Sequence, residues 1–144
     1  MNPSLPRKIA ELQAFAVIGL ELFERAGETA QAAFPGVAQD MSRVLGEQLS
    51  WATPLADQEK AEKTTLKLRG MMERYIGDDW HNPVEILEWS GFYLGAAAMH
   101  WSLVEGWLRV SDDTRSTYAR QQTALFTTWL EASLARIQHL SAST

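Results

Sequence analysis

The sequence predicts an all-α protein, folded as an antiparallel four-helix bundle of long helices with one additional short helix. The first observation is the lack of strand signals: no run of β-branched residues alternates with polar ones, and no Asn-Gly or Asp-Gly pair marks a hairpin. The second is that proline, glycine and paired aspartates divide the chain into pieces of helical length. The third is the length of 144 residues, which is typical of one domain. We therefore expect residues 1–144 to form a single helical-bundle domain.

The first 50 residues predict one long helix and the short one. Residues 5–33 place apolar side chains at helical spacing on one broad face, which includes Gly19, and glutamates on the opposite face. A Pro-Gly pair follows and ends this helix. Residues 37–49 then form the short helix, with Gln48 on its inner side.

The third helix is predicted to start at Thr53. This residue would be the N-cap, and Pro54 would occupy the first helical position. Proline suits that position because a backbone N–H there makes no hydrogen bond within the helix. The helix runs to about Ile76 and is largely polar, and a glycine with two aspartates follows it. Its apolar residues lie on one narrow side of the helix: Ala61, Leu68, Met72, Tyr75 and Ile76.

Two more long helices complete the prediction. Asn82 and Pro83 begin the fourth, which covers residues 83–110. Ser111 or Asp112 caps the fifth. The side chains of the fifth helix that should point inward are Tyr118, Ala119, Phe126, Trp129, Leu130, Leu134 and Ile137.

The predicted helix 83–110 is apolar on nearly all sides. It carries three of the six tryptophans, and it has no lysine or arginine between Pro83 and Leu108. Such a helix must be covered all round, by its own bundle or by a partner. The side chains that we expect to form an apolar contact surface are Trp89, Phe92, Tyr93, Trp101 and Trp107.

Small residues occupy the remaining side of this helix. Gly91, Gly95 and Ser102 are the predicted close-packing positions, because small residues spaced in this way allow a second backbone to approach. A glycine inside a helix costs about 1 kcal/mol relative to alanine, so its presence suggests a packing reason. The close approach could be a helix crossing inside the monomer, or a contact with another subunit or with a nonpolar surface.

His100 and Glu105 are the candidates for an internal pocket that would hold a metal or a small ligand. A histidine in an apolar helix can act as a ligand, although it is more often a hydrogen-bonded core residue. A buried Glu105 would need a partner, and Arg109 is the nearest one in sequence. The loop with Asp78, Asp79, His81 and Glu85 also gathers possible metal ligands, but helix capping explains most of these residues.

Other chemistry is not predicted. The chain has no cysteine, which excludes thiol catalysis, zinc ribbons, iron–sulfur clusters and disulfides. The residues three positions before His100 and His139 are Ala97 and Arg136, so the Glu-x-x-His pattern of di-iron bundles is missing. We therefore expect no catalytic residues, no bound metal and no cofactor, and we do not expect an enzyme.

Charge and hydropathy limit the partners. The chain has 18 acidic and 13 basic residues, and its net charge of −5 argues against a nucleic-acid partner. The longest stretch without a formal charge, residues 89–104, is 16 residues long and thus shorter than the ~20 residues of a membrane span. The N-terminal residues lack the apolar core of a secretory signal. A cytoplasmic protein is expected.

Two segments of the chain resemble a known family. Leu12-Gln13-Ala14-Phe15 is followed by a long helix that contains alanine and glutamate, and residues 82–88 lead into an alanine-rich helix with aromatic residues. These segments look like the first helix and the mid-chain stretch of phasins, the small cytoplasmic proteins that coat polyhydroxyalkanoate granules. The resemblance implies a non-enzymatic helical protein whose apolar faces meet a granule surface or each other, and it carries over no individual functional residue.

The function predicted from the sequence is therefore non-enzymatic binding through an apolar helix surface. The protein is expected to self-associate as a homo-oligomer, and a phasin-like coat of a hydrophobic polymer granule is the most concrete form of this role. Two alternatives stay open. One is a bundle with an internal metal or ligand pocket around His100 and Glu105, and the other is a regulatory subunit of a larger complex with a protein partner.

Overall fold

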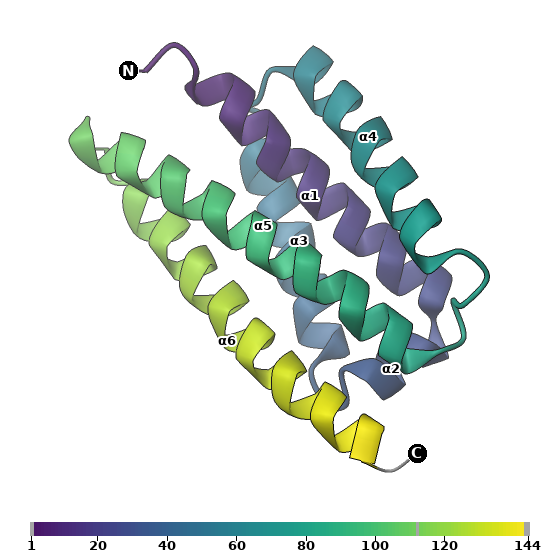
Figure 1. Ribbon diagram of the computed structural model, residues 1–144. Helices are drawn as coiled ribbons and strands as arrows, with labels where there is room; N and C mark the ends of the chain where they lie inside the picture. Colours follow the sequence, from purple (N-terminus) through teal and green to yellow (C-terminus); the bar gives the residue numbers. More distant parts are fainter. Residues whose placement is uncertain (1, 112, 143–144) are drawn as a thin grey trace.

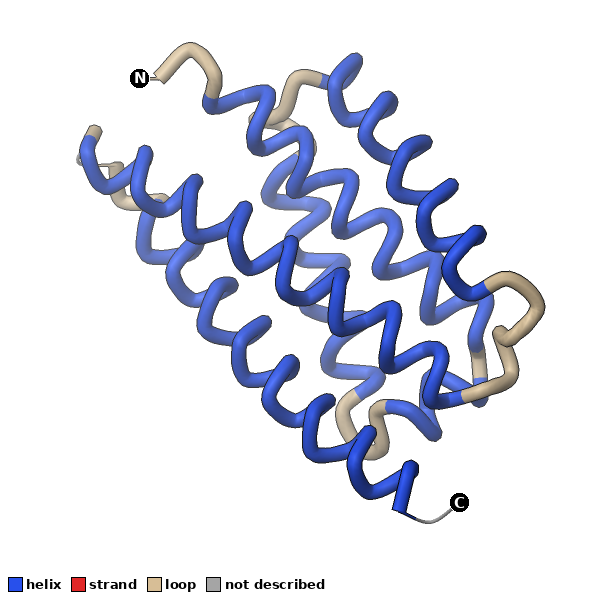
Figure 2. Tube along the Cα trace, viewed as in Figure 1, coloured by secondary structure: helices blue, strands red, loops and turns tan. Residues whose placement is uncertain are grey.

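The computed structural model describes residues 2–111 and 113–142, and the regular elements in these residues are all helices (Figure 2). The predicted all-α class is confirmed. The helices are α1 (Leu5–Ala26), α2 (Glu28–Ala33), α3 (Ala38–Ala52), α4 (Gln58–Ile76), α5 (Pro83–Val110) and α6 (Ser116–Ala142).

The helices α4, α1, α5 and α6 lie side by side, and α3 lies behind them (Figure 1). Among the five longer helices, α3, α4, α5 and α6 each run antiparallel to the longer helix that precedes them in the chain (Figure 1). The core lies where α1, α3, α5 and α6 meet, and α2 closes one end of it against α5. The large side chains that are fully buried there include Ile18, Leu45, Trp101 and Phe126.

The predicted helix 5–33 is divided at Gly27. This residue has a φ of 51°, a conformation that favours glycine, and its N–H donates to the carbonyl of Phe23 at 3.0 Å. The chain therefore turns between α1 and α2 instead of continuing to residue 33. A single glycine inside an apolar periodic pattern does not reveal from sequence that it will adopt a positive φ.

The predicted short helix, residues 37–49, is α3, and it is part of the core rather than an addition to it. Met41 and Leu45 are buried, and the buried Gln48 donates from Nε2 to Oε1 of Gln122 on α6 at 2.9 Å. The predicted division into four long helices and one additional short helix is therefore not confirmed.

The start of α4 was also predicted wrongly. The hydroxyl of Thr53 donates to the carbonyl of Leu49 at 2.6 Å, and Thr53 therefore ends α3. The N-cap of α4 is Asp57, whose carboxylate accepts from the N–H of Lys60 at 3.1 Å. Asp57 has the extended backbone that an N-cap residue requires, whereas Thr53 has a helical backbone.

The predicted bounds of the helix 83–110 are confirmed. The side chain of Asn82 accepts from the N–H of Val84 at 3.0 Å, and Pro83 occupies the first helical position. Ser111 is at the end of α5 rather than the start of α6, and Asp112 lies outside the described residues. In α6, Leu134 is 59% exposed, contrary to its predicted inward position.

Candidate functional site

Three of the five side chains that were predicted to form a contact surface lie in the core. Trp89, Tyr93 and Trp101 are 4%, 6% and 1% exposed. The Tyr93 hydroxyl donates to the backbone carbonyl of Phe15 on α1, and burial raises the pKa of Tyr93. The Trp101 ring packs at 5.3 Å from the ring of Trp51 on α3. These residues hold the domain together and are not available to a partner.

The other two side chains differ from each other. Trp107 is half-buried and packs against the core. Phe92 is 63% exposed, and it meets the Tyr75 ring of α4 edge-on at 5.3 Å. Of the five predicted residues, Phe92 alone has most of its surface in contact with solvent.

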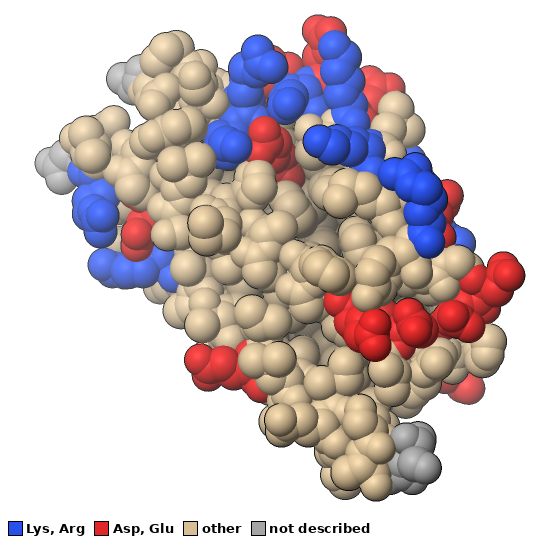
Figure 3. Space-filling view, viewed as in Figure 1, with Lys and Arg blue, Asp and Glu red and all other residues tan. Residues whose placement is uncertain are grey.

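An exposed apolar face runs along α5 on the side of Phe92. Met99 and Leu103, about two and three helical turns beyond it, are 73% and 40% exposed. We call this surface the α5 face, and it consists of Phe92, Gly95, Ala96, Met99, Ser102, Leu103 and Gly106. Figure 3 shows it as an uncharged surface across the middle of the molecule. Met99 and Leu103 were missed in the sequence because their exposure depends on where the neighbouring helices lie.

The glycines of α5 do not mark a close helix crossing inside the monomer. A Cβ atom placed on Gly91, Gly95 or Gly106 would meet nothing within 4 Å, and Ser102 is exposed. The close approach in this fold lies instead at Gly19 of α1, where a Cβ atom would come within 2.8 Å of Leu45 Cδ1 and still closer to the Tyr93 hydroxyl. The predicted close packing inside the monomer is therefore wrong for α5, and the α5 glycines leave shallow positions open on the surface.

The two ends of the α5 face carry opposite charges. Acidic side chains gather near the connection between α4 and α5, and basic side chains lie at the opposite end (Figure 3). Glu88 accepts from the Tyr75 hydroxyl at 3.0 Å, and removal from water together with the charges of Glu88 and Asp79 raises the pKa of Glu85. Near the C-terminal end of α5, the Arg109 side chain is 70% exposed, and its Nη1 atom is 3.8 Å from Oε2 of Glu105. Glu88 and Arg109 are about 30 Å apart along the helix.

His100 and Glu105 do not form one pocket. They are five residues apart, which places them about 140° apart around the helix. His100 lies towards α1, with Nδ1 at 2.7 Å from the Ala96 carbonyl and Nε2 at 2.6 Å from Oε2 of Glu11. The Glu105 side chain is 16% exposed and has Arg109 beside it. The structure does not bring the two residues together.

Glu11 is the polar centre between α1, α4 and α5 that the sequence analysis missed. Its carboxylate lies 2.8 Å from Lys8 Nζ, 3.9 Å from Lys60 Nζ and 2.6 Å from His100 Nε2. Burial acts to raise the pKa of Glu11, but the hydrogen bonds and charges of Lys8 and His100 outweigh it, and the pKa is lowered. Lys60 and His100 come from other helices, so only Lys8, three residues away, could have been paired with Glu11 from sequence. This arrangement is a network of ion pairs and hydrogen bonds that joins three helices.

The described residues contain no group of three or more His, Asp or Glu side chains placed to hold a metal ion. The loop before α5 contributes the N-cap of that helix, Asn82. Within residues 2–111 and 113–142, no helix is long and apolar enough to cross a membrane.

The features that stand out are thus a charge-free apolar face with opposite charges at its ends and a partly buried polar network around Glu11. In comparisons with known proteins, no family model, no curated protein and no solved structure matches the chain.

Proposed function

We propose that this protein is a non-enzymatic interaction protein that self-associates through the α5 face. The observation that carries the proposal is the exposure of three large apolar side chains, Phe92, Met99 and Leu103, along one charge-free side of a single helix. Removing such side chains from water is favourable by about 25 cal/mol for each Å² of apolar surface. An exposed row of this kind is typical of an interaction surface rather than of a site for catalysis.

The α5 face is complementary to itself. In an antiparallel pair of α5 helices that cross at Met99, residues at equal distances from Met99 face each other. Phe92 then faces Gly106 of the second copy, because both are seven residues from Met99. Leu103 faces Gly95, because both are four residues away. Phe92 and Leu103 each meet an open position that carries no Cβ atom, and Met99 meets Met99 of the second copy at the crossing, so the two surfaces can interdigitate.

The charges at the two ends fit the same arrangement. Glu88 and Arg109 are eleven and ten residues from Met99 on opposite sides. An antiparallel pair would therefore place Glu88 of one copy near Arg109 of the other, twice in the dimer. A two-fold axis requires this kind of reciprocal contact, in which each copy presents the same surface.

The size of the surface indicates a weak dimer. Stable interfaces bury at least ~1,200 Å² in total, and a single pair of crossing helices with this narrow a face buries less. Met71 and Tyr75 of α4, which border a hollow next to Phe92, extend the apolar surface at one end. We expect a dimer that dissociates on dilution.

Two further assignments support this function. We infer that α1, α3, α5 and α6 act as an antiparallel four-helix bundle, with α4 packed outside on α1 and α5, so that one side of α5 stays open.

We place the protein in the cytoplasm, since a chain without cysteine needs no oxidising compartment. In this arrangement the net charge of −5 limits assembly beyond the specific pair.

Sedimentation velocity over a range of protein concentrations tests the proposal. The wild type should shift from monomer to dimer as the concentration rises. Glu88→Arg and Arg109→Glu should each raise the dimer Kd by about tenfold, because like charges then meet at both ends, and the double variant should restore the dimer. Arg43→Glu, on exposed α3 surface, is the matched charge-reversal control and should leave the Kd unchanged.

Three outcomes would contradict the proposal. A wild type that stays monomeric at all concentrations would exclude self-association. A dimer that is unchanged in both single variants and in Phe92→Ser would place the interface elsewhere. A monomer that adsorbs to particles of a hydrophobic polyester, and loses that adsorption in Phe92→Ser, would support the phasin-like coat of a granule instead.

A further inference from the structure

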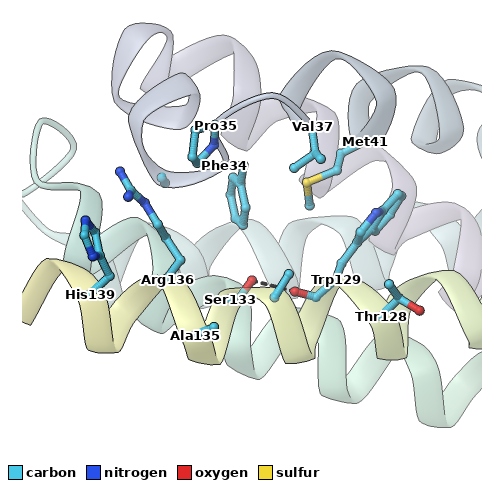
Figure 4. A pocket seen from close by; sticks show the side chains of 12 residues that line it. Phe34, Pro35, Val37, Met41, Thr128, Trp129, Ser133, Ala135, Arg136 and His139 are labelled. Carbon is cyan, nitrogen blue, oxygen red and sulfur yellow. Dashed lines mark hydrogen bonds between the residues drawn. The ribbon is translucent and has the colours of Figure 1, made fainter.

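A pocket of about 600 Å³ opens between α6 and the turn that joins α2 to α3 (Figure 4). Its walls are apolar: Phe34 lies in the middle, Val37 and Met41 lie on the side of the turn, and the Trp129 ring stands at one end. The volume is within the range of ~300–1,000 Å³ that is typical of small-molecule sites. This pocket is separate from the α5 face, and the inference drawn from it does not depend on self-association.

Arg136 stands at the opposite end of the pocket from Trp129 (Figure 4). Both residues belong to α6 and are seven positions apart, so they lie on the same side of the helix about 10 Å from each other. His139 lines the same end as Arg136. The pocket is therefore apolar along its length and has a cationic group at one end.

The charge of Arg136 is not balanced inside the described part of the chain. Its Nη2 atom donates to the backbone carbonyl of Ala32 at 3.1 Å, which fixes the guanidinium at the turn. Its Nε atom is buried and has no hydrogen-bond partner. None of the ion pairs formed by residues 2–111 and 113–142 involves Arg136, and no acidic side chain lines the pocket.

An anion beside this guanidinium would make a charge-assisted hydrogen bond at the edge of an apolar cavity, where such bonds are stronger than in water. An apolar group attached to the anion would extend along the pocket towards Trp129. A cation would be repelled, and a neutral apolar molecule would leave the charge without a partner. The chemistry of the pocket therefore selects a molecule with one carboxylate and one apolar tail.

We propose that this pocket binds a small amphipathic carboxylate, with its tail between Phe34 and Trp129 and its carboxylate at Arg136. The exposed alanines of α6 at the mouth, Ala132 and Ala135, leave room for the tail, because a larger side chain at either position would occupy the cavity. The ligand would be a fatty acid of medium chain length or an aryl-alkanoic acid.

Isothermal titration calorimetry with three probes of equal chain length tests this proposal: octanoate, octanol and octylammonium. Octanoate should bind the wild type saturably, at least about tenfold tighter than octanol, and octylammonium should bind weakest. In Arg136→Met, which keeps the length of the side chain but not its charge, the affinity for octanoate should fall by about tenfold, to that of octanol. The affinity for octanol should stay unchanged.

A second pair of variants tests the cavity without touching the arginine. Ala132→Leu fills the pocket and should abolish octanoate binding, whereas Ala124→Leu, also exposed on α6 but not in the pocket, should have no effect. Thermal melts of all variants check that they fold. The proposal is overturned if the wild type binds no octanoate, if octanol binds it as tightly as octanoate, or if Arg136→Met or Ala132→Leu binds octanoate like the wild type.

Discussion

The two sides of α5 are alike in composition and opposite in role. On one side Trp89, Tyr93 and Trp101 are almost completely buried against the neighbouring helices. On the other side Phe92 and Met99 are 63% and 73% exposed. Both sides consist of large apolar residues in the same charge-free stretch, so the type of residue does not separate core from surface here. The positions of α1, α3 and α6 around α5 determine which of its residues are buried and which are exposed.

The largest effect that this comparison predicts is the difference between Trp101→Ala and Phe92→Ala in the stability of the monomer. Trp101 is 1% exposed, and its loss leaves a cavity that costs about 3–5 kcal/mol of the free energy of unfolding. Phe92 is 63% exposed and meets the Tyr75 ring edge-on, and its replacement should cost about 1 kcal/mol or less. Urea denaturation at a concentration where the protein is monomeric measures both values. Equal losses would show that the α5 face is covered in the monomer.

Smaller effects are expected when a glycine is replaced by alanine. The replacement should destabilise the protein at Gly19, which packs against the buried side of α5, and stabilise it at Gly95 on the exposed side. In Gly19→Ala the new methyl group would collide with the buried Leu45 and Tyr93 side chains, and we expect a loss of about 1–3 kcal/mol in the free energy of unfolding. In Gly95→Ala the methyl group meets open space, and the higher helix propensity of alanine should add about 0.5–1 kcal/mol. Chemical denaturation of the two variants measures both free energies of unfolding. A Gly95→Ala variant that is less stable than the wild type would show that Gly95 does not lie on an open surface.

The smallest expected effect concerns how the partly buried network around Glu11 makes the stability depend on pH. The folded-state pKa of Glu11 is lowered from its ordinary value of 4.5, so the unfolded chain binds the proton more readily. The stabilisation by Glu11 is thus fully present above about pH 4.5 and is lost as the pH falls below that value. The free energy of unfolding, measured at about pH 6 and about pH 3, should decrease less in Glu11→Gln than in the wild type. Glu59→Gln, on the exposed side of α4, is the control and should behave like the wild type.

The features that could be predicted from the sequence alone are those that depend on interactions between residues close together in the chain. The helical class and the bounds of α5 were predictable, because Asn82 caps the helix from two residues away and Pro83 suits its first position. The apolar and charge-free character of α5, and the concentration of tryptophan in it, were also readable from the sequence. All of these features act over a few residues, so no knowledge of the neighbouring helices was needed.

The tertiary structure alone decided which parts of these helices are buried and which are exposed. Small residues in α5 predicted a close crossing, but the crossing lies at Gly19, because Tyr93 of α5 and Leu45 of α3 meet α1 there. The partner of His100 is Glu11, from a different helix, and the pocket beside Arg136 lies between segments about a hundred residues apart in the chain. Helical periodicity gives the angle of a side chain around its own axis but not the direction in which the next helix lies, and that direction is set by how all the apolar faces pack together.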